Sequence, residues 1–509
     1  MPSDPLLRFR RSAAQLHALA AVERTIRATD TSSRRQYLRD FSEAFKAYRW
    51  VLSASEVDQR AKASDIVLVG DYHALPASQL FTAGLIERLA ASGRPVTLGV
   101  EAIVARDQHI LDEWQSNEID ADELRARIHF ETGWGYDWQP FRQLLHRSRA
   151  AGARIFGLDC TPRQDMRSIR ARDRHAAIKI DELRNLYPDS ILVVLFGESH
   201  LAPNHLPRLV RKMRGDDCIL TVLQNVDPVY WLSAGEPQDL VEAVELQDDV
   251  VCVFSATPLE KYEHYRLAIE RWKQERSHCA DLSPSFYNLI VTFFQFLNVD
   301  PYSTEHTTNR GFLVDELPEV WCAARNEEQF ERLLDRRLGA QADSIRQELD
   351  RAGCYFLPDR NVMVAREYRM PWAAEQAARC VYRACQGKRL QEREPARSAE
   401  DHFFARALES ALSFFGSKVL CPARKVFPEC EVVEDRYYSG PSDWASNPDA
   451  IRMFGYSLGS DLYTAYVRGD VSKRWLRGLF YKDVSKPGAA LALYSRAADK
   501  VRSGNLNSA

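Results

Sequence analysis

Residues 65–73 read DIVLVGDYH, and a similar pattern returns at 190–200 as SILVVLFGESH. Each stretch contains an apolar run rich in Val, Ile and Leu, long enough for one buried β-strand. Each run ends in Gly, an acid, any residue and His, at Gly70–His73 and again at Gly197–His200. We expect each glycine to permit a sharp turn, because glycine adopts positive φ at little cost. The two stretches therefore predict two strands that each end in a carboxylate and an imidazole.

Apolar runs alternate with helix-like segments throughout the region from 65 to about 257. Beyond the two opening stretches, the runs cover residues 96–100, 154–158, 218–223 and 250–254. Alternation of this kind is typical of a mostly parallel sheet that is covered by helices on both faces. The predicted fold class is therefore α/β.

The regions on either side have helical spacing without this alternation. Charged segments with helical periodicity dominate after residue 258, and the sequence there has no Gly-rich loop of the nucleotide-binding kind. We expect an N-terminal helical segment at 1–60, an α/β domain at 61–257 and a large, mainly α-helical C-terminal region at 258–509.

The composition is that of an ordinary globular protein. Of 509 residues, 45% are hydrophobic and 27% are charged, and the net charge of −3 gives no sign of nucleic-acid or anionic-membrane binding. No stretch approaches the roughly 18 apolar residues of a transmembrane helix, and the N-terminus does not read as a secretory signal. The ten cysteines include no C-x-x-C pair. We therefore expect reduced thiols and a cytoplasmic location.

Polar or titratable side chains follow five consecutive predicted strands, at the edge where open parallel sheets bind ligands. Proximity to water accounts for the polar residues of some strand ends, but it accounts poorly for two histidines and a glutamate together. We expect His73, Glu101 and His200 to converge, with Asp71 and Glu198 in support. The strand-end residues, in chain order, are Asp71, Tyr72, His73, Glu101, Asp159, Cys160, Glu198, Ser199, His200, Gln224 and Asn225.

Two imidazoles and several carboxylates suit three kinds of chemistry. They can ligate Zn, Mn, Co or Fe and so activate a water for hydrolysis, with His73, Glu101, His200 and Asp71 as ligands. Without a metal, one histidine can act as general base, and the other histidine or a glutamate such as Glu198 can act as acid. A histidine or Tyr72 can instead hold haem iron. Spacing alone does not choose among these chemistries.

Residues from about 62 to 230 resemble the ChaN-like haem-binding-uptake family, which is similar to TIKI proteases, TraB/PrgY proteins and erythromycin esterases. The resemblance implies hydrolysis of an ester or amide at a metal centre, on a small-molecule or peptide substrate, or else binding of haem or iron without catalysis. A partner-binding scaffold is a third hypothesis, but the paired histidines and acids argue against it. The matching features are the two G-x-x-H motifs, Glu101 in LGVEAI, Gln108, the segment WGYDWQP at 134–140 and Arg172-Asp173.

Overall fold

The protein divides into two compact units. Unit 1 comprises Met1–Asp4 and Val22–Glu275, and unit 2 comprises Pro5–Ala21 and Arg276–Ala509. Helix α1 (Pro5–Arg27) crosses the division, and helix α12 (Pro258–Lys273) belongs to unit 1. The computed structural model describes residues 4–30, 36–161, 169–238, 240–273, 280–299, 317–322, 330–332, 342–386, 398–426 and 447–506.

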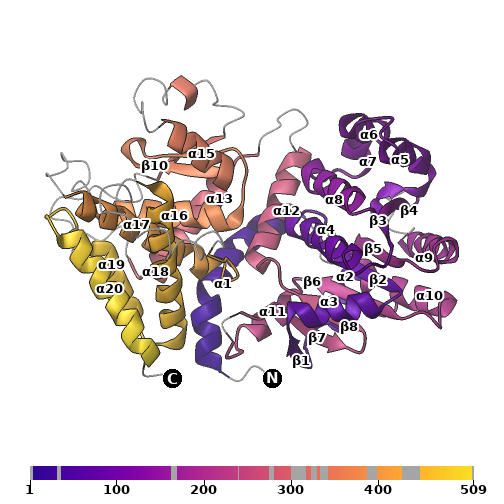
Figure 1. Ribbon diagram of the computed structural model, residues 1–509, viewed down its shortest axis with the longest axis horizontal. Helices are drawn as coiled ribbons and strands as arrows, with labels where there is room; N and C mark the ends of the chain where they lie inside the picture. Colours follow the sequence, from indigo (N-terminus) through magenta and orange to yellow (C-terminus); the bar gives the residue numbers. More distant parts are fainter. Residues whose placement is uncertain are drawn as a thin grey trace. The chain divides into compact units, whose positions relative to one another are not determined.

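Unit 1 is organised around an eight-stranded sheet with the strand order β1-β7-β8-β6-β2-β5-β3-β4 (Figure 1). The six strands from β8 to β4 run parallel, whereas β7 is antiparallel to β8 and β1 is antiparallel to β7. The α/β fold class is therefore confirmed, and β1 and β7 form an antiparallel edge that the apolar runs did not predict. The strands are β1 (Trp50–Leu52), β2 (Ile66–Asp71), β3 (Val96–Val104), β4 (Arg154–Asp159), β5 (Ile191–Gly197), β6 (Ile219–Gln224), β7 (Ala243–Gln247) and β8 (Val250–Val253).

Helices cover both faces of this sheet, and each face has its own apolar core. In β2, Val67 and Val69 belong to the core that includes α3–α8, whereas Ile66 and Leu68 belong to the core that includes α2, α9, α10 and α11. Burial on both faces explains why the strands read as continuous apolar runs. The helices are α2 (Gln36–Ala44), α3 (Ala54–Ala63), α4 (Pro76–Ala90), α5 (Gln108–Gln115), α6 (Ala121–Arg127), α7 (Phe130–Gly133), α8 (Trp138–Ala150), α9 (Ile169–Leu186), α10 (Leu206–Met213) and α11 (Asp227–Ser233).

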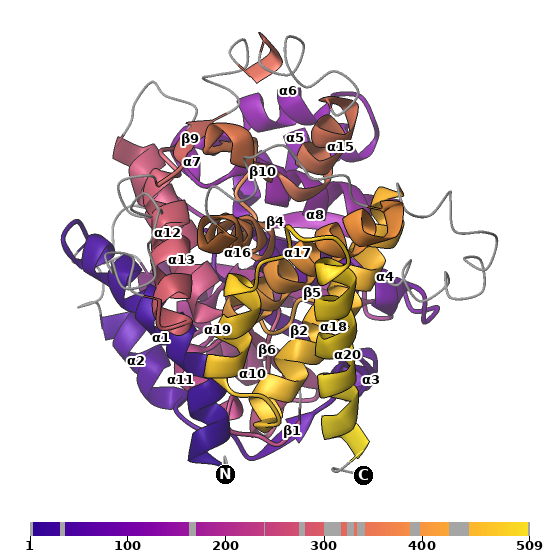
Figure 2. The ribbon, with the colours of Figure 1, turned by 90° about the vertical axis from the view of Figure 1, so that its left-hand side faces the viewer.

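Unit 2 is mainly helical, as expected, and α17 packs against α16, α18 and α20 (Figure 2). Gly455 and Gly459 let α18 lie directly against α17, because a Cβ atom at either position would overlap Ser410 or Ala411. A three-stranded sheet in the order β10-β11-β9 was not predicted. The elements are α13 (Ser283–Phe296), β9 (Glu319–Cys322), α15 (Ala342–Ala352), β10 (Cys354–Leu357), β11 (Val362–Ala365), α16 (Met370–Gln386), α17 (Ala399–Leu420), α18 (Pro448–Arg468), α19 (Lys473–Tyr481) and α20 (Ala489–Leu506).

Two further features bear on the expectations from composition. None of the helices in the described ranges has both the length and the apolar character needed to cross a membrane. Among the residues that the structure describes, seven cysteines are free thiols, but Cys322 is disulfide-bonded, which departs from the expectation of reduced thiols.

Candidate functional site

His73, Glu101 and His200 lie together beside the carboxyl ends of the central strands. Nε2 of His73 is 3.9 Å from Oε2 of Glu101, and Nε2 of His200 is 4.0 Å from Oε1 of the same carboxylate. The histidines follow β2 and β5, and Glu101 lies on β3; these three strands are consecutive in the sheet and parallel. The structure thus brings together the three residues on which the sequence analysis centred.

Glu101 lies inside β3, whereas the sequence analysis placed it after the strand. The pairing of β3 with β5 ends at Val100, and the pairing with β4 shifts register between Val100 and Val104. This irregularity extends the strand beyond the expected end. Glu101 is the first residue past the pairing with β5, where its Oε2 accepts a 2.5 Å hydrogen bond from the backbone N–H of Gly197.

Each imidazole is oriented by a buried aspartate. Nδ1 of His73 lies 2.8 Å from Oδ2 of Asp71, and Nδ1 of His200 lies 2.5 Å from Oδ1 of Asp173. Because an ionised aspartate only accepts hydrogen bonds, each Nδ1 carries the proton and each neutral ring keeps its lone pair on Nε2. Two Asp–His dyads therefore turn their Nε2 atoms toward Glu101.

The aspartates of both dyads are themselves held in place. Oδ1 of Asp71 accepts a hydrogen bond from the side-chain amide of Gln79, and Oδ2 of Asp173 accepts one from the hydroxyl of Tyr37. The ring of Tyr37 also packs edge-on against His200, with the ring centroids 5.4 Å apart. Side chains from α2, α4 and α9 thus fix the orientation of the two imidazole rings.

A buried arginine holds Glu101 in its ionised form. Arg172 donates a 2.5 Å hydrogen bond to Oε1 of Glu101 and two hydrogen bonds, of 2.8 and 2.9 Å, to Asp159. Burial favours the neutral acid, but His73, His200 and Arg172 more than offset that effect and hold the pKa of Glu101 well below its usual range. Glu101 therefore stays charged at neutral pH and attracts any imidazolium that forms beside it.

The pKa values of the first dyad are shifted by burial and by mutual attraction. Burial opposes protonation of His73, but the charge of Asp71 and its hydrogen bond outweigh that effect and raise the pKa of His73. Burial also raises the pKa of Asp71, although His73 opposes the shift. His73 is thus protonated at a higher pH than an ordinary histidine.

Glu198 faces Lys261 of α12 rather than the histidine pair. Nζ of Lys261 lies 3.0 Å from Oε1 of Glu198 and 3.4 Å from Oδ1 of Asp227, and it lies 4.6 Å from the ring centroid of Tyr72. Burial raises the pKa of Glu198 although Lys261 opposes the shift, and burial raises the pKa of Tyr72 well above its usual value.

The two motif glycines serve a purpose other than the one expected. Neither Gly70 nor Gly197 has a positive φ, and φ of Gly197 is −49°. A Cβ atom on Gly197 would lie 3.1 Å from Oε2 of Glu101 and 3.2 Å from Nε2 of His73. A side chain at 197 would therefore require Glu101 or His73 to move by a few tenths of an ångström.

The sequence analysis gave no role in the site to Asp173, Tyr37 or Lys261. Arg172 and Asp173 had been noted only for the family resemblance. A signal for these two was present, because they lie on the same buried face of α9 as Ile169 and Ala176. An adjacent Arg-Asp pair on an apolar helix face is unusual and predicts buried charge partners.

Two strand-end residues that had been considered as candidates have structural partners instead. The amide of Gln224 donates to the backbone oxygen of Gly70 at 2.8 Å. Oδ1 of Asn225 accepts from the backbone N–H groups of Ser255 and Ala256, each at 2.9 Å. These hydrogen bonds connect the end of β6 to neighbouring segments. The histidine pair therefore remains the candidate catalytic centre.

The donor set does not fit the metal site that was expected. Within the part of the chain that the structure describes, no group of three or more His, Cys, Asp or Glu side chains is arranged to hold a metal ion. Both oxygens of Glu101 already accept hydrogen bonds from Arg172 and Gly197, and Asp71 binds the far nitrogen of His73.

Two aromatic side chains pack beside the partly exposed ring of His73. Its side chain is 20% exposed. The rings of Trp134 and Tyr136 lie beside it, with centroid distances of 4.4 and 5.2 Å. His73 is thus the residue of the pair that a haem could reach.

Residues 57–192 match the family model described as haem-binding uptake, Tiki superfamily, ChaN, which confirms the resemblance seen in the sequence. The match ends inside β5, before Gly197 and His200. One similar solved structure shows cofacial heme binding to ChaN of Campylobacter jejuni. Its sequence is 14% identical to this one, the alignment covers 34% of this chain and 86% of that chain, and the TM-score is 0.27. The structure of the type III effector HopBA1 is also 14% identical, covering 39% of this chain and 90% of that chain, with a TM-score of 0.30. No curated protein matches the sequence.

Proposed function

We propose that unit 1, whose residues 57–192 belong to the ChaN-like family of the Tiki superfamily, hydrolyses an ester or amide by acid–base catalysis between His73 and His200. One observation carries this proposal. Each imidazole is fixed through Nδ1 by a buried aspartate, while its Nε2 atom faces the same carboxylate, Glu101. Hydrolysis needs one group to take a proton from water and another to give a proton to the leaving group.

The two histidines have different roles in this proposal. His73 is the acid, because its raised pKa and 20% exposed side chain suit a group that meets the substrate protonated. His200 is the base, held by Asp173 and Tyr37. Nε2 of His200 takes a proton from water as the oxygen adds to the carbonyl carbon, and Nε2 of His73 gives its proton to the departing oxygen or nitrogen.

Glu101 acts on both histidines through its charge. Arg172 and the N–H of Gly197 keep its carboxylate ionised and fixed, so that it stabilises the imidazolium on either side. Solvent then returns the proton from His200 to His73 after the products leave. The substrate is a small molecule or a peptide, and the proposal includes a cytoplasmic location.

Turnover of p-nitrophenyl acetate and of a p-nitroanilide by the full chain tests this function. His73→Gln and His200→Gln are each expected to lower kcat/KM by about 10²–10⁴-fold, the usual worth of a positioned acid or base. His109→Gln, an exposed histidine on α5, is the control and should leave turnover unchanged. Loss of turnover in a chelator, with recovery on adding Zn²⁺ or Mn²⁺, would contradict the metal-free chemistry.

Haem binding is the second candidate, favoured by the family match and by the aromatic rings beside His73. Nε2 of His73 would hold the iron, which supplies redox and ligand-binding chemistry when it is bound. Titration with haemin is expected to give a Soret band that His73→Ala abolishes and Tyr72→Phe preserves. A band that survives His73→Ala would rule out this ligand.

A further inference from the structure

The two Asp–His dyads differ in the group that binds the far oxygen of each aspartate, the one turned away from the histidine. In the first dyad, the side-chain amide of Gln79 donates a hydrogen bond to that oxygen of Asp71. In the second dyad, the hydroxyl of Tyr37 donates one to that oxygen of Asp173. Both aspartates are buried, so the protein donors decide how much of each carboxylate charge is left for the histidine.

A phenol hydroxyl and an amide draw unequal charge from a carboxylate. The hydroxyl is the more acidic donor, and its hydrogen bonds to an ionised oxygen are the shorter and stronger ones. Burial and the hydrogen bond to Asp173 raise the pKa of Tyr37, so the hydroxyl keeps the proton that it donates. The aspartate of the second dyad therefore keeps less charge for His200 than the aspartate of the first dyad keeps for His73.

The other charges near the two imidazoles do not cancel this difference. Glu101 faces both rings at nearly equal distances, 3.9 and 4.0 Å, and Arg172 is bound to the same carboxylate. Glu198 adds a charge on the side of His73, but Nζ of Lys261 lies 3.0 Å from it and offsets that charge. The far-oxygen donor is thus the main difference between the hydrogen-bond partners of the two dyads.

Tyr37 is held in place by a further histidine and by its own helix. Its ring packs edge-on against the imidazole of His205, with the ring centroids 3.8 Å apart and an interplanar angle of 88°. Nε2 of His205 lies 3.2 Å from Oδ2 of Asp40, which is one turn further along α2. His205 therefore contacts two residues of α2 and fixes the direction in which the hydroxyl of Tyr37 points.

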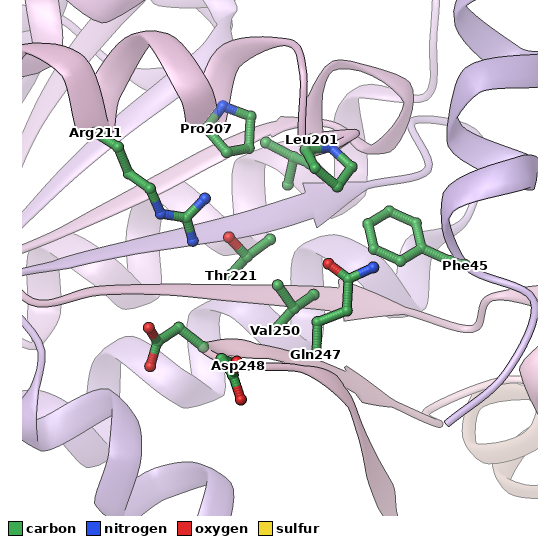
Figure 3. A pocket seen from close by; sticks show the side chains of 10 residues that line it. Phe45, Leu201, Pro207, Arg211, Thr221, Gln247, Asp248 and Val250 are labelled. Carbon is green, nitrogen blue, oxygen red and sulfur yellow. The ribbon is translucent and has the colours of Figure 1, made fainter. Parts of the chain in front are cut away.

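Space beside α2 gives these contacts their importance. A cavity of about 250 Å³ is lined by Phe45, which follows α2, and by Leu201, which follows His200 in the short helix η4 (Glu198–Leu201) (Figure 3). Apolar packing thus leaves room beside both segments. The polar contacts of Tyr37 and Asp40 consequently take a larger part in fixing α2.

Given the proposed hydrolysis, on which this assignment rests, we propose that the far-oxygen donors decide which histidine is the acid and which is the base. Tyr37 draws charge from the aspartate of the second dyad, which favours a neutral imidazole at His200 that can take a proton from water. Gln79 draws less charge from the aspartate of the first dyad, which favours an imidazolium at His73 that can give its proton to the leaving group. Tyr37 and Gln79 are therefore positioning residues with opposite roles.

The leaving group of the substrate distinguishes the two roles. p-Nitrophenolate departs without a proton, whereas ethoxide needs one, so a weaker acid slows ethyl acetate more than p-nitrophenyl acetate. Tyr37→Phe is expected to lower kcat/KM about tenfold for both esters, the scale of one hydrogen bond to a charged group. Gln79→Met keeps the length of the side chain, and it is expected to lower kcat/KM for ethyl acetate at least about fivefold more than for p-nitrophenyl acetate.

Tyr48→Phe is the matched control, because it also removes a tyrosine hydroxyl that is bound to a carboxylate, that of Glu236, without touching either dyad. It should leave both kcat/KM values unchanged. A larger loss for ethyl acetate in Tyr37→Phe, or equal losses for the two esters in Gln79→Met, would overturn the assignment while the hydrolysis stands. Absence of turnover in the unmodified chain would overturn the hydrolysis and the assignment with it.

His205→Gln gives a second test that leaves both dyads intact. It is expected to lower kcat/KM about threefold for both esters, because the hydroxyl of Tyr37 is held less firmly. In a chain that already carries Tyr37→Phe, the same substitution is expected to cause no further loss, since residues that act through one group are not additive. Losses that multiply in the double variant would show that His205 does not act through Tyr37.

Discussion

Gly197 is the residue at which the backbone comes closest to the candidate catalytic groups. Its N–H donates a hydrogen bond to Oε2 of Glu101, and a Cβ atom at this position would lie 3.2 Å from Cε1 and Nε2 of His73. The second G-x-x-H motif therefore owes its glycine to crowding, because any side chain there would stand between the histidine and the carboxylate.

We expect Gly197→Ala to lower kcat/KM by about 10–100-fold, because an added methyl group displaces His73 or Glu101 by a fraction of an ångström or more. Gly70→Ala is the matched control from the first motif. A Cβ atom at residue 70 would meet its nearest neighbour, Cβ of Glu198, at 3.4 Å, which is ordinary contact. Equal losses in the two variants would contradict the crowding argument.

The pH dependence of activity follows from Asp71. As the proposed acid, His73 must be protonated, so activity falls as pH rises through its pKa, which lies above the usual histidine value. Asp71→Asn removes the charge that raises this pKa and leaves the burial that lowers it. The alkaline limb of the kcat/KM profile is therefore expected to move to lower pH.

A matched variant checks that the shift is local. Asp58→Asn removes an acid that pairs with Arg88 at the surface, and it should leave the alkaline limb unchanged. An alkaline limb that stays fixed in Asp71→Asn would show that His73 is not the acid.

The same raised pKa makes His73 contribute to stability below about pH 6.5, and this contribution is lost as pH rises through the folded-state pKa.

At the scale of the elements, two helices carry the charges that complete the site. Helix α9 supplies Arg172 and Asp173, and helix α12 supplies Lys261. Lys261 is 3% exposed and is the cation between Glu198 and Asp227. Buried carboxylates need a counter-charge, and Lys261 of α12 supplies it to Glu198 and Asp227.

Lys261→Met is expected to lower the free energy of unfolding by about 3–5 kcal/mol, the usual cost of leaving a buried charge without its partner. Lys179→Met is the control, because Lys179 forms a surface pair with Glu182 three residues away in its own helix. Its expected effect is under about 1 kcal/mol. Urea unfolding measures both values, and equal values would show that Lys261 is not a buried counter-ion.

At the scale of the whole molecule, the periodicity of apolar residues predicted the strands and helices, which depend on local sequence pattern. The six parallel strands β2, β3, β4, β5, β6 and β8 and the mainly helical second half follow from apolar runs and helical spacing. The convergence of His73 and His200 follows from parallel strands that share one edge. The identity of the partners of Asp173, Tyr37 and Lys261 could not be predicted in the same way, because these contacts depend on how distant helices pack. The disagreement over metal ligation has the same origin, since only packing shows that Arg172 and Gly197 already occupy the oxygens of Glu101.

The aromatic rings around the two candidate histidines have a spectroscopic consequence. Trp134 lies 4.4 Å from the ring of His73, and the rings of Tyr37 and Phe196 lie 5.4 and 5.0 Å from that of His200. The π-electron currents of these rings displace the nuclear resonances of the imidazole Cε1–H groups from those of exposed histidines. Aromatic rings also lie beside His205 and His146, at centroid distances of 3.8 and 5.4 Å. Loss of one displaced resonance in His73→Gln and of another in His200→Gln would assign the pair, and an NMR titration can then follow each imidazole separately.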